Sequence, residues 1–121
     1  MKSYVQFEKE LSAEFREKLA KTETVVEVGD VFSQTAQKFL KKILPDITLK
    51  PTLQIKFEPT SPPYYVIPQE LKTGQLKELL DDSDFPAILE RFATACYNRR
   101  LHLEEIEKTK TSKRPPGSPN T

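Results

Sequence analysis

Side chains that can act as a nucleophile or a general base are scarce in this sequence. Its 121 residues include one histidine (His102), one cysteine (Cys96), no tryptophan and three glycines. A thiol and an imidazole activate each other only when the two groups meet. Cys96 and His102 stand six residues apart in a stretch that we expect to be helical, so their side chains point in different directions. The sequence therefore predicts no catalytic residue and no cofactor, and it favours a binding protein over an enzyme.

Carboxylates gather at one place in the chain, at Glu78, Asp81, Asp82 and Asp84. Such clusters can bind Ca²⁺ or Mg²⁺, but an EF-hand loop also needs a glycine and a distal glutamate at fixed spacing. No glycine follows at that spacing, and helix capping together with a solvated linker accounts for these residues. A zinc site needs three or four ligands, which the surroundings of His102 do not offer. We therefore expect no metal site.

Charge is spread unevenly along the chain. Nineteen basic and eighteen acidic side chains give a net charge of +1, yet four of the basic residues and none of the acidic ones follow residue 107. The chain is thus a mildly acidic body with a basic tail. Basic clusters of this kind can contact a nucleic-acid backbone, which keeps a nucleic-acid partner open as an alternative.

A lone cysteine cannot form an internal disulfide, which fits a reducing compartment. The first residues contain no apolar signal core, and no apolar run approaches the ~20 residues of a membrane span. We expect a soluble, cytoplasmic protein that has no membrane contact. The length favours one α+β domain over residues 1–110, followed by a disordered, basic and proline-rich tail over residues 111–121.

The first half of the chain has two helical stretches separated by a valine-rich segment. Apolar residues recur every three or four positions from Phe7 to Lys21, which predicts an amphipathic helix. Residues 24–28 contain three valines and indicate a short strand. A second helix is expected to begin after Gly29 with Asp30 as its N-cap, and to end at Pro45.

Apolar residues alternate with polar ones from Ile47 to Glu58, the pattern of a strand with one buried face. A stiff proline-rich loop follows, and residues 64–67 return as the partner strand. This hairpin belongs to a small antiparallel sheet of two or three strands, packed by helices. A short helix near residues 73–80 and a long last helix, capped by Ser83 or Asp84, complete the predicted α+β fold.

The last helix carries the residue pattern of a coiled-coil seam. Positions 85, 89, 92, 96, 99, 103 and 106 alternate steps of four and three, and six of the seven are apolar, the exception being Arg99. A helix of about 25 residues spans ~37 Å, whereas a domain of ~100 residues has a radius of gyration near 13 Å. Two interpretations stay open. The helix is either an ordinary amphipathic helix that lies on its own sheet and has a frayed end, or its end beyond Tyr97 packs on another protein or a second copy.

We therefore expect a small non-enzymatic protein with an assembly or regulatory role, which binds a protein partner or forms a homodimer. Its contact surfaces would be the long last helix and the hairpin, where proline and tyrosine suit an interface. The alternative is a nucleic-acid-associated regulator that uses the hairpin or the basic C-terminal segment. The predicted interface residues are Tyr64, Tyr65, Tyr97, Arg99, Arg100, Leu103 and Ile106.

Overall fold

The computed structural model describes residues 3–47 and 54–112, with side chains to residue 106. This part of the chain is mostly helical, with four α-helices and a two-stranded antiparallel sheet, so the α+β prediction is confirmed in this coarse form. The strands pair Lys56 with Val66 and Phe57 with Tyr65. The elements are α1 (Val5–Ala20), α2 (Val25–Ile43), β1 (Lys56–Phe57), β2 (Tyr65–Val66), a 3-10 turn η1 (Gln69–Leu71), α3 (Gly74–Asp82) and α4 (Phe85–Ser112).

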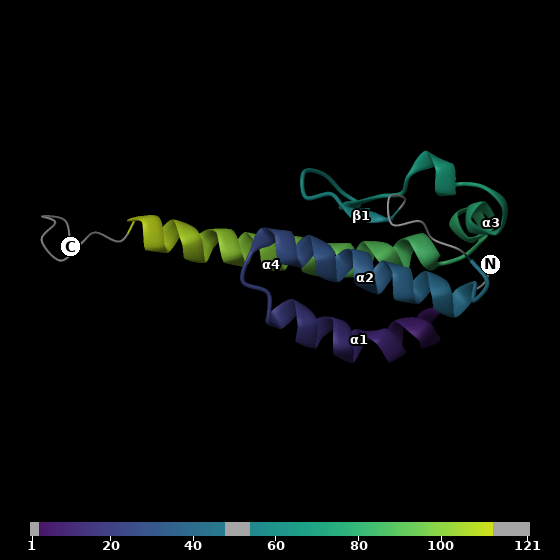
Figure 1. Cartoon of the computed structure of the whole chain (residues 1–121), viewed down its shortest axis with the longest axis horizontal. Helices are drawn as coiled ribbons and strands as arrows, with labels where there is room; N and C mark the ends of the chain where they lie inside the picture. The colour runs from purple at the N-terminus through teal and green to yellow at the C-terminus, as the bar shows by residue number, and fades with distance from the viewer. Residues whose placement is uncertain (1–2, 48–53, 113–121) are drawn as a thin grey trace, which may run out of the picture.

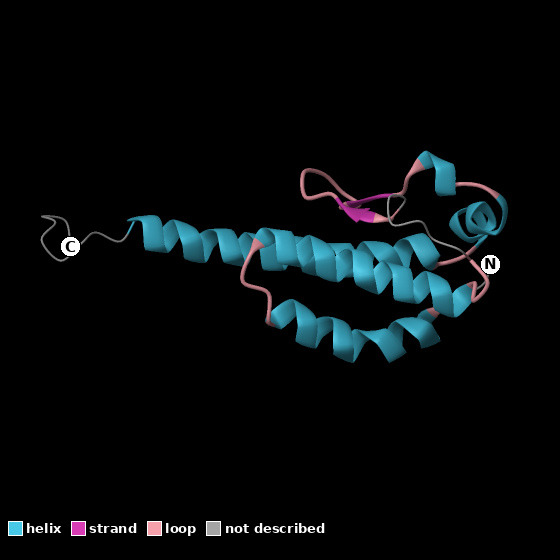
Figure 2. Cartoon of the chain, viewed as in Figure 1, coloured by secondary structure: helices cyan, strands magenta, loops and turns pink. Residues whose placement is uncertain are grey.

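The long helices α2 and α4 lie side by side and run in opposite directions (Figure 1). Helix α1 packs on one side of this pair, and the β1–β2 hairpin packs on the other, with β1 against α2 and β2 against α4 (Figure 2). The two central helices are therefore covered on both sides, which explains why they supply most of the core.

Aromatic side chains join the layers in the core. The rings of Phe39 on α2 and Phe85 on α4 stack with their centroids 5.0 Å apart. Phe92 lies edge-on to Phe15 of α1 at 4.7 Å and also contacts Phe39. Phe32 of α2 stacks on Tyr65 of the hairpin at 6.3 Å. Pairs of this kind contribute about 0.5–1.5 kcal/mol beyond the burial of their area.

The strand that we predicted over residues 24–28 is wrong, because these residues begin α2. Thr24 caps the helix: its hydroxyl accepts a hydrogen bond from the Glu27 backbone N–H at 3.2 Å, and the Glu27 carboxylate accepts one from the Thr24 N–H at 3.1 Å. This reciprocal capping box satisfies two exposed donors, which outweighs the weak strand preference of valine. Asp30, the predicted N-cap, is an exposed residue inside the helix.

The predicted hairpin is confirmed in its partner strand and in part of its first strand. Ile55 is buried and Phe57 half-buried, as their alternate positions required, but the paired region covers two residues of each strand. Residues 48–53 of the predicted first strand lie outside the described residues. The sequence predicted a sheet of two or three strands, and the described ranges contain two.

Polar contacts fix the start of α4 to the start of α1. The Ser83 hydroxyl accepts a hydrogen bond from the Phe85 N–H at 3.1 Å, so the predicted cap at Ser83 is present. Asp84 instead accepts hydrogen bonds from the Tyr4 N–H at 2.8 Å and the Ser3 hydroxyl at 2.7 Å. The predicted boundary at residue 111 stays a prediction, because residues 113–121 lie outside the described residues.

Candidate protein-interaction surface

Arg99 marks the place where α4 leaves the body of the protein. Its guanidinium donates hydrogen bonds from Nη2 to the carbonyl oxygens of Ala20, at 3.0 Å, and Thr22, at 2.6 Å. Nε donates to Thr22 Oγ1 at 3.1 Å. The carbonyl groups at the end of α1 have no partner within their own helix and carry partial negative charge, which favours a cation there. The turn between α1 and α2 is thus tied to α4 at this level.

Beyond this point α4 continues as a segment that we call the α4 projection (residues 100–112), in which Leu103 still packs on the edge of the core. Its thirteen residues span about 20 Å at 1.5 Å per residue. Figure 1 shows it extending past the ends of α1, α2 and the hairpin, and among the described residues none of the other elements runs beside it. The predicted overhang is therefore present, and the contact of its end with another protein or a second copy stays a prediction.

Apolar side chains continue onto the α4 projection. Leu103 still packs against the core at its edge, whereas Ile106, one turn further, is 39% exposed. Leu101 is 45% exposed and lies one turn beyond Tyr97, on the side of the helix that faces the hairpin. A large apolar side chain exposed alone is ordinary, but several around one feature mark a contact surface.

A second group of exposed apolar side chains lies at the base of the projection, on the segment that we call the α2 shoulder (residues 23–30). Val25 is 40% and Val26 70% exposed, although both begin a helix whose later residues form the core. They follow directly on Thr22, which accepts the hydrogen bonds of Arg99. The shoulder and the projection therefore adjoin each other and form one corner.

The hairpin lies against α4 through two tyrosines. The rings of Tyr64 and Tyr97 stack with centroids 4.2 Å apart and planes inclined by 13°. Tyr64 has a φ of 70°, in the left-handed region that side chains with a Cβ rarely adopt. The Glu58 N–H donates to its carbonyl at 2.8 Å, and the Tyr64 N–H donates to the Ser61 carbonyl at 3.0 Å. The stack and these bonds hold the tyrosine in this strained conformation.

Tyr65 points the other way, into the fold. Its hydroxyl donates a hydrogen bond to the Pro86 carbonyl at 3.3 Å, and its ring stacks on Phe32. Burial raises the pKa of the Tyr65 hydroxyl, because the phenolate would lose its hydration, and the nearby Glu90 carboxylate adds to this effect. This tyrosine connects the hairpin to α4 and is a structural residue.

The predicted interface residues thus fall into two groups. Tyr65 and Arg99 are engaged within the fold, and Arg100 pairs with Glu104 one turn later, Nη1 to Oε1 3.0 Å. Tyr64, Tyr97, Leu103 and Ile106 line the region where α4 emerges, each with part of its surface exposed.

Sequence reasoning missed three exposed apolar side chains in this region. Val25 and Val26 were assigned to a strand, and Leu101 falls outside the seam. The capping box formed by Thr24 and Glu27 was the available signal for the two valines, since it places them in the first exposed turn of a helix.

Cys96 and His102 differ in their exposure to solvent. Cys96 is fully buried, and burial raises the pKa of its thiol to about 12. Its thiolate is therefore absent at neutral pH, and the thiolate is the nucleophilic form. His102 is exposed on the α4 projection.

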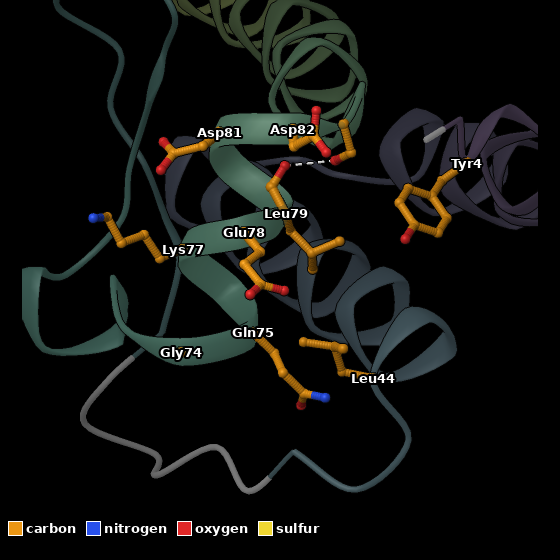
Figure 3. Close-up of a pocket in the computed structure, with 10 residues that line it drawn as sticks. Tyr4, Leu44, Gly74, Gln75, Lys77, Glu78, Leu79, Asp81 and Asp82 are labelled. Carbon is orange, nitrogen blue, oxygen red and sulfur yellow. Dashed lines mark hydrogen bonds between the residues drawn. The ribbon is translucent and has the colours of Figure 1, made fainter. Parts of the chain in front are cut away.

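A groove of about 640 Å³ lies between α3, the start of α1 and the end of α2 (Figure 3). The side chains of Gln75 and Glu78 extend toward Leu44, whereas Lys77 and Asp81 point away from it. Within the described residues, no three side chains among histidine, cysteine, aspartate and glutamate are grouped to hold a metal ion. The carboxylates among the residues that line this groove, Glu78, Asp81 and Asp82, are exposed.

Comparison with protein-family models, with curated proteins and with solved structures finds no match to this chain. Of the helices in the described ranges, none has the length and hydrophobicity that a membrane crossing would require.

Proposed function

We propose that this chain is a small non-enzymatic protein-interaction protein, with an assembly or regulatory role, and that the α4 projection is its main contact surface. The hairpin side of the helix, at Tyr64, Tyr97 and Leu101, extends this surface. One observation carries the proposal: α4 continues for nine residues, about 13 Å, past Leu103, which still packs on the core, and it keeps an exposed apolar side chain at Ile106.

A free helix of this length has little stability of its own. The projection propagates from the packed part of α4 and so avoids the nucleation cost of an isolated helix, but without packing each added turn contributes little stability in water. Among the described charged pairs, Arg100 with Glu104 supports the projection by only about 0.3–0.5 kcal/mol. A partner that covers Ile106 and the exposed part of Leu103 on one side of the helix, or Leu101 on the hairpin side, would supply packing there, which is the physical argument for an interaction.

A nucleic-acid partner has weaker support. The two arginines at the base of the projection are already used, Arg99 by the carbonyls of the α1–α2 turn and Arg100 by Glu104. The hairpin adds one exposed lysine, Lys56, and further basic residues follow Glu107 in the sequence. A protein partner therefore explains more of the described surface.

The proposal can be tested by capture from a native lysate with a matched pair of variants. Leu101→Glu together with Ile106→Glu changes the projection, whereas Ala13→Glu together with Ala87→Glu adds the same charges on exposed positions of the body. Far-UV circular dichroism verifies that all three proteins are folded. We expect proteins that bind the wild type and the body variant but not the projection variant.

The same capture, repeated after nuclease treatment and across a salt gradient, separates the two kinds of partner. Binding through phosphates weakens steeply between low and moderate salt, whereas apolar packing does not. Retention that disappears with nuclease or with salt would support the nucleic-acid alternative. Equal capture by all three proteins would contradict a role for the projection.

A further inference from the structure

The apolar seam of α4 loses its neighbours at the level of Arg99. Below this level helices cover the seam: Phe92 lies edge-on to Phe15 of α1, and α2 packs along the same part of α4. Arg99 contacts the turn that joins α1 to α2, so both of these helices have an end there. Leu103 and Ile106 are the next two seam positions, and Ile106 is already 39% exposed. The seam thus continues past its cover, and a helix is the neighbour that its spacing fits.

Carboxylates surround the α2 shoulder at the foot of this uncovered seam. Glu23, Glu27 and Asp30 are exposed, and the sequence has no basic residue from 22 to 37. Among the described residues, none of these three carboxylates has a cation within ion-pair distance. Glu27 accepts hydrogen bonds from the backbone N–H groups of residues 23 and 24 and lies in the first turn of α2, where the helix dipole favours a negative charge. Glu23 and Asp30 lie outside that turn, so their charges lack this compensation.

The lysine and arginine side chains of the turn and of the base of the projection are already engaged. Lys21 pairs with Glu17, Nζ to Oε1 3.1 Å, and Arg100 pairs with Glu104. The guanidinium of Arg99 is bound to the carbonyl oxygens of the α1–α2 turn. The shoulder therefore presents exposed carboxylates beside its two exposed valines, which makes it an apolar surface with a negative rim.

We propose that the corner binds an amphipathic helix of another protein, which packs its apolar stripe on Leu103 and Ile106 and directs lysine or arginine side chains toward the carboxylates of the α2 shoulder. This inference rests on the proposed function and names the chemistry of the partner. The projection spans about 20 Å, so a partner helix of about 13 residues matches its length. Binding of an amphipathic helix through its apolar face is a recurring mode of peptide recognition.

A second copy of the chain fits this corner less well than a basic partner. Its shoulder carries the same three carboxylates, and the described part of its projection adds Glu104 and Glu105 against one arginine, Arg100. Two such corners placed together would oppose carboxylates to carboxylates, and like charges across an interface are unfavourable. The same charges disfavour the phosphates of a nucleic acid at this place. A helix rich in lysine or arginine is instead attracted by the shoulder.

Selection from a library of displayed random peptides tests the chemistry of the partner without assuming its sequence. The bait is the full-length wild-type protein, and the peptides have about 16 residues, enough for a helix as long as the projection. We expect the enriched peptides to carry apolar residues at every third or fourth position, and more lysine and arginine than the starting library. A consensus peptide is then synthesised with a fluorescent label, and its dissociation constant is measured by fluorescence anisotropy.

Matched variants locate the binding site of this peptide. Glu23→Gln with Asp30→Asn removes two carboxylates from the shoulder, whereas Glu78→Gln with Asp81→Asn removes two exposed ones from α3, at the other end of the molecule. The shoulder variant should bind the peptide about 3- to 10-fold more weakly, because each exposed charge pair contributes a modest amount, and the α3 variant should bind it as the wild type does. Ile106→Glu should weaken binding about tenfold or more. Circular dichroism verifies that each variant is folded.

Three results would overturn the proposal. The first is enrichment of no peptide, or of peptides without an excess of lysine and arginine. The second is equal weakening by the shoulder and α3 variants, which would show that net charge rather than the corner determines binding. The third is a wild-type dimer in sedimentation equilibrium that Ile106→Glu abolishes, since a second copy would then occupy the corner. The lysate capture with projection variants depends on none of these results, so failure of the basic partner and failure of the proposed function remain distinguishable.

Discussion

Arg99 and Arg100 are neighbours in the sequence with different roles, and this difference gives a direct test of the structure. Arg99 donates three hydrogen bonds to the α1–α2 turn, whereas Arg100 forms one exposed ion pair with Glu104. Arg99→Ala removes the bonds that tie the turn to α4, and Arg100→Ala removes a pair that lies wholly within α4.

The magnitude follows from these contacts. Arg99 is half-buried, so water can replace part of each lost bond, and each contributes about 0.5–1 kcal/mol rather than the 1.5–3 kcal/mol of a charged bond in the interior. The three together give a loss of about 2 kcal/mol. An exposed pair one helical turn apart, such as Arg100 with Glu104, contributes about 0.3–0.5 kcal/mol.

Urea denaturation followed by far-UV circular dichroism measures both losses. With a denaturant slope of about 2 kcal/mol per molar urea, Arg99→Ala lowers the midpoint by about 1 M and Arg100→Ala by about 0.2 M. Arg99→Lys should fall between the two, because it keeps the charge but loses the planar fork that reaches several acceptors. Midpoints for the two alanine variants that agree within about 0.2 M would refute this account of the turn.

Three further predictions concern the core, the α1–α2 ion pairs and the hairpin. The Cys96 thiol, with a pKa of about 12, should resist iodoacetamide in the folded protein at pH 8 and react only on unfolding; labelling as fast as that of a free thiol contradicts the buried position. The hydrogen bond from Lys38, followed by that from Lys18, lowers the pKa of Glu14 to about 2 from 4.5. Because the pKa of Glu14 is lower in the folded protein, its carboxylate stabilises the fold above pH 4.5, and this stabilisation is lost as the pH falls toward 2. Glu14→Gln should therefore lower the melting temperature at pH 7 but not at pH 2. Tyr97 on α4 stacks on Tyr64 of the hairpin, so Tyr97→Ala should destabilise the fold by about 1–3 kcal/mol in thermal denaturation, whereas Asn98→Ala, at an exposed site on the same helix, should change the stability by less than about 0.5 kcal/mol; equal effects of the two variants would show that the stack contributes nothing.

Helices with a long apolar period could be predicted from the sequence, and the reason is visible in α4. Phe85, Leu89, Phe92 and Cys96 repeat at steps of four and three, and all four are buried against the other layers. The same repeat continues to Ile106, which is 39% exposed and lies past the described elements that pack on α4. The sequence therefore predicted the helix and its overhang, but the pattern alone could not say where the core ends.

The start of α2 could not be predicted from residue preferences, because two local signals compete there. The valines after Thr24 favour a strand, whereas the reciprocal bonds between Thr24 and Glu27 favour a helix. The contacts of Arg99 could not be predicted from the sequence either. Its place in an apolar seam suggested a contact with a partner, and only the fold shows that the carbonyls of Ala20 and Thr22 come within its reach.

The central claim is that the protein acts through the end of α4 that leaves its fold, and photo-crosslinking along this helix tests it most directly. A photoreactive amino acid is placed at His102 on the projection or at Glu90 on the body, two exposed positions of the same helix. The account predicts covalent adducts, with a second copy or with another protein, from position 102 and few from position 90. Adducts in equal yield from both positions, or none from position 102 under conditions that label a known complex, would contradict it.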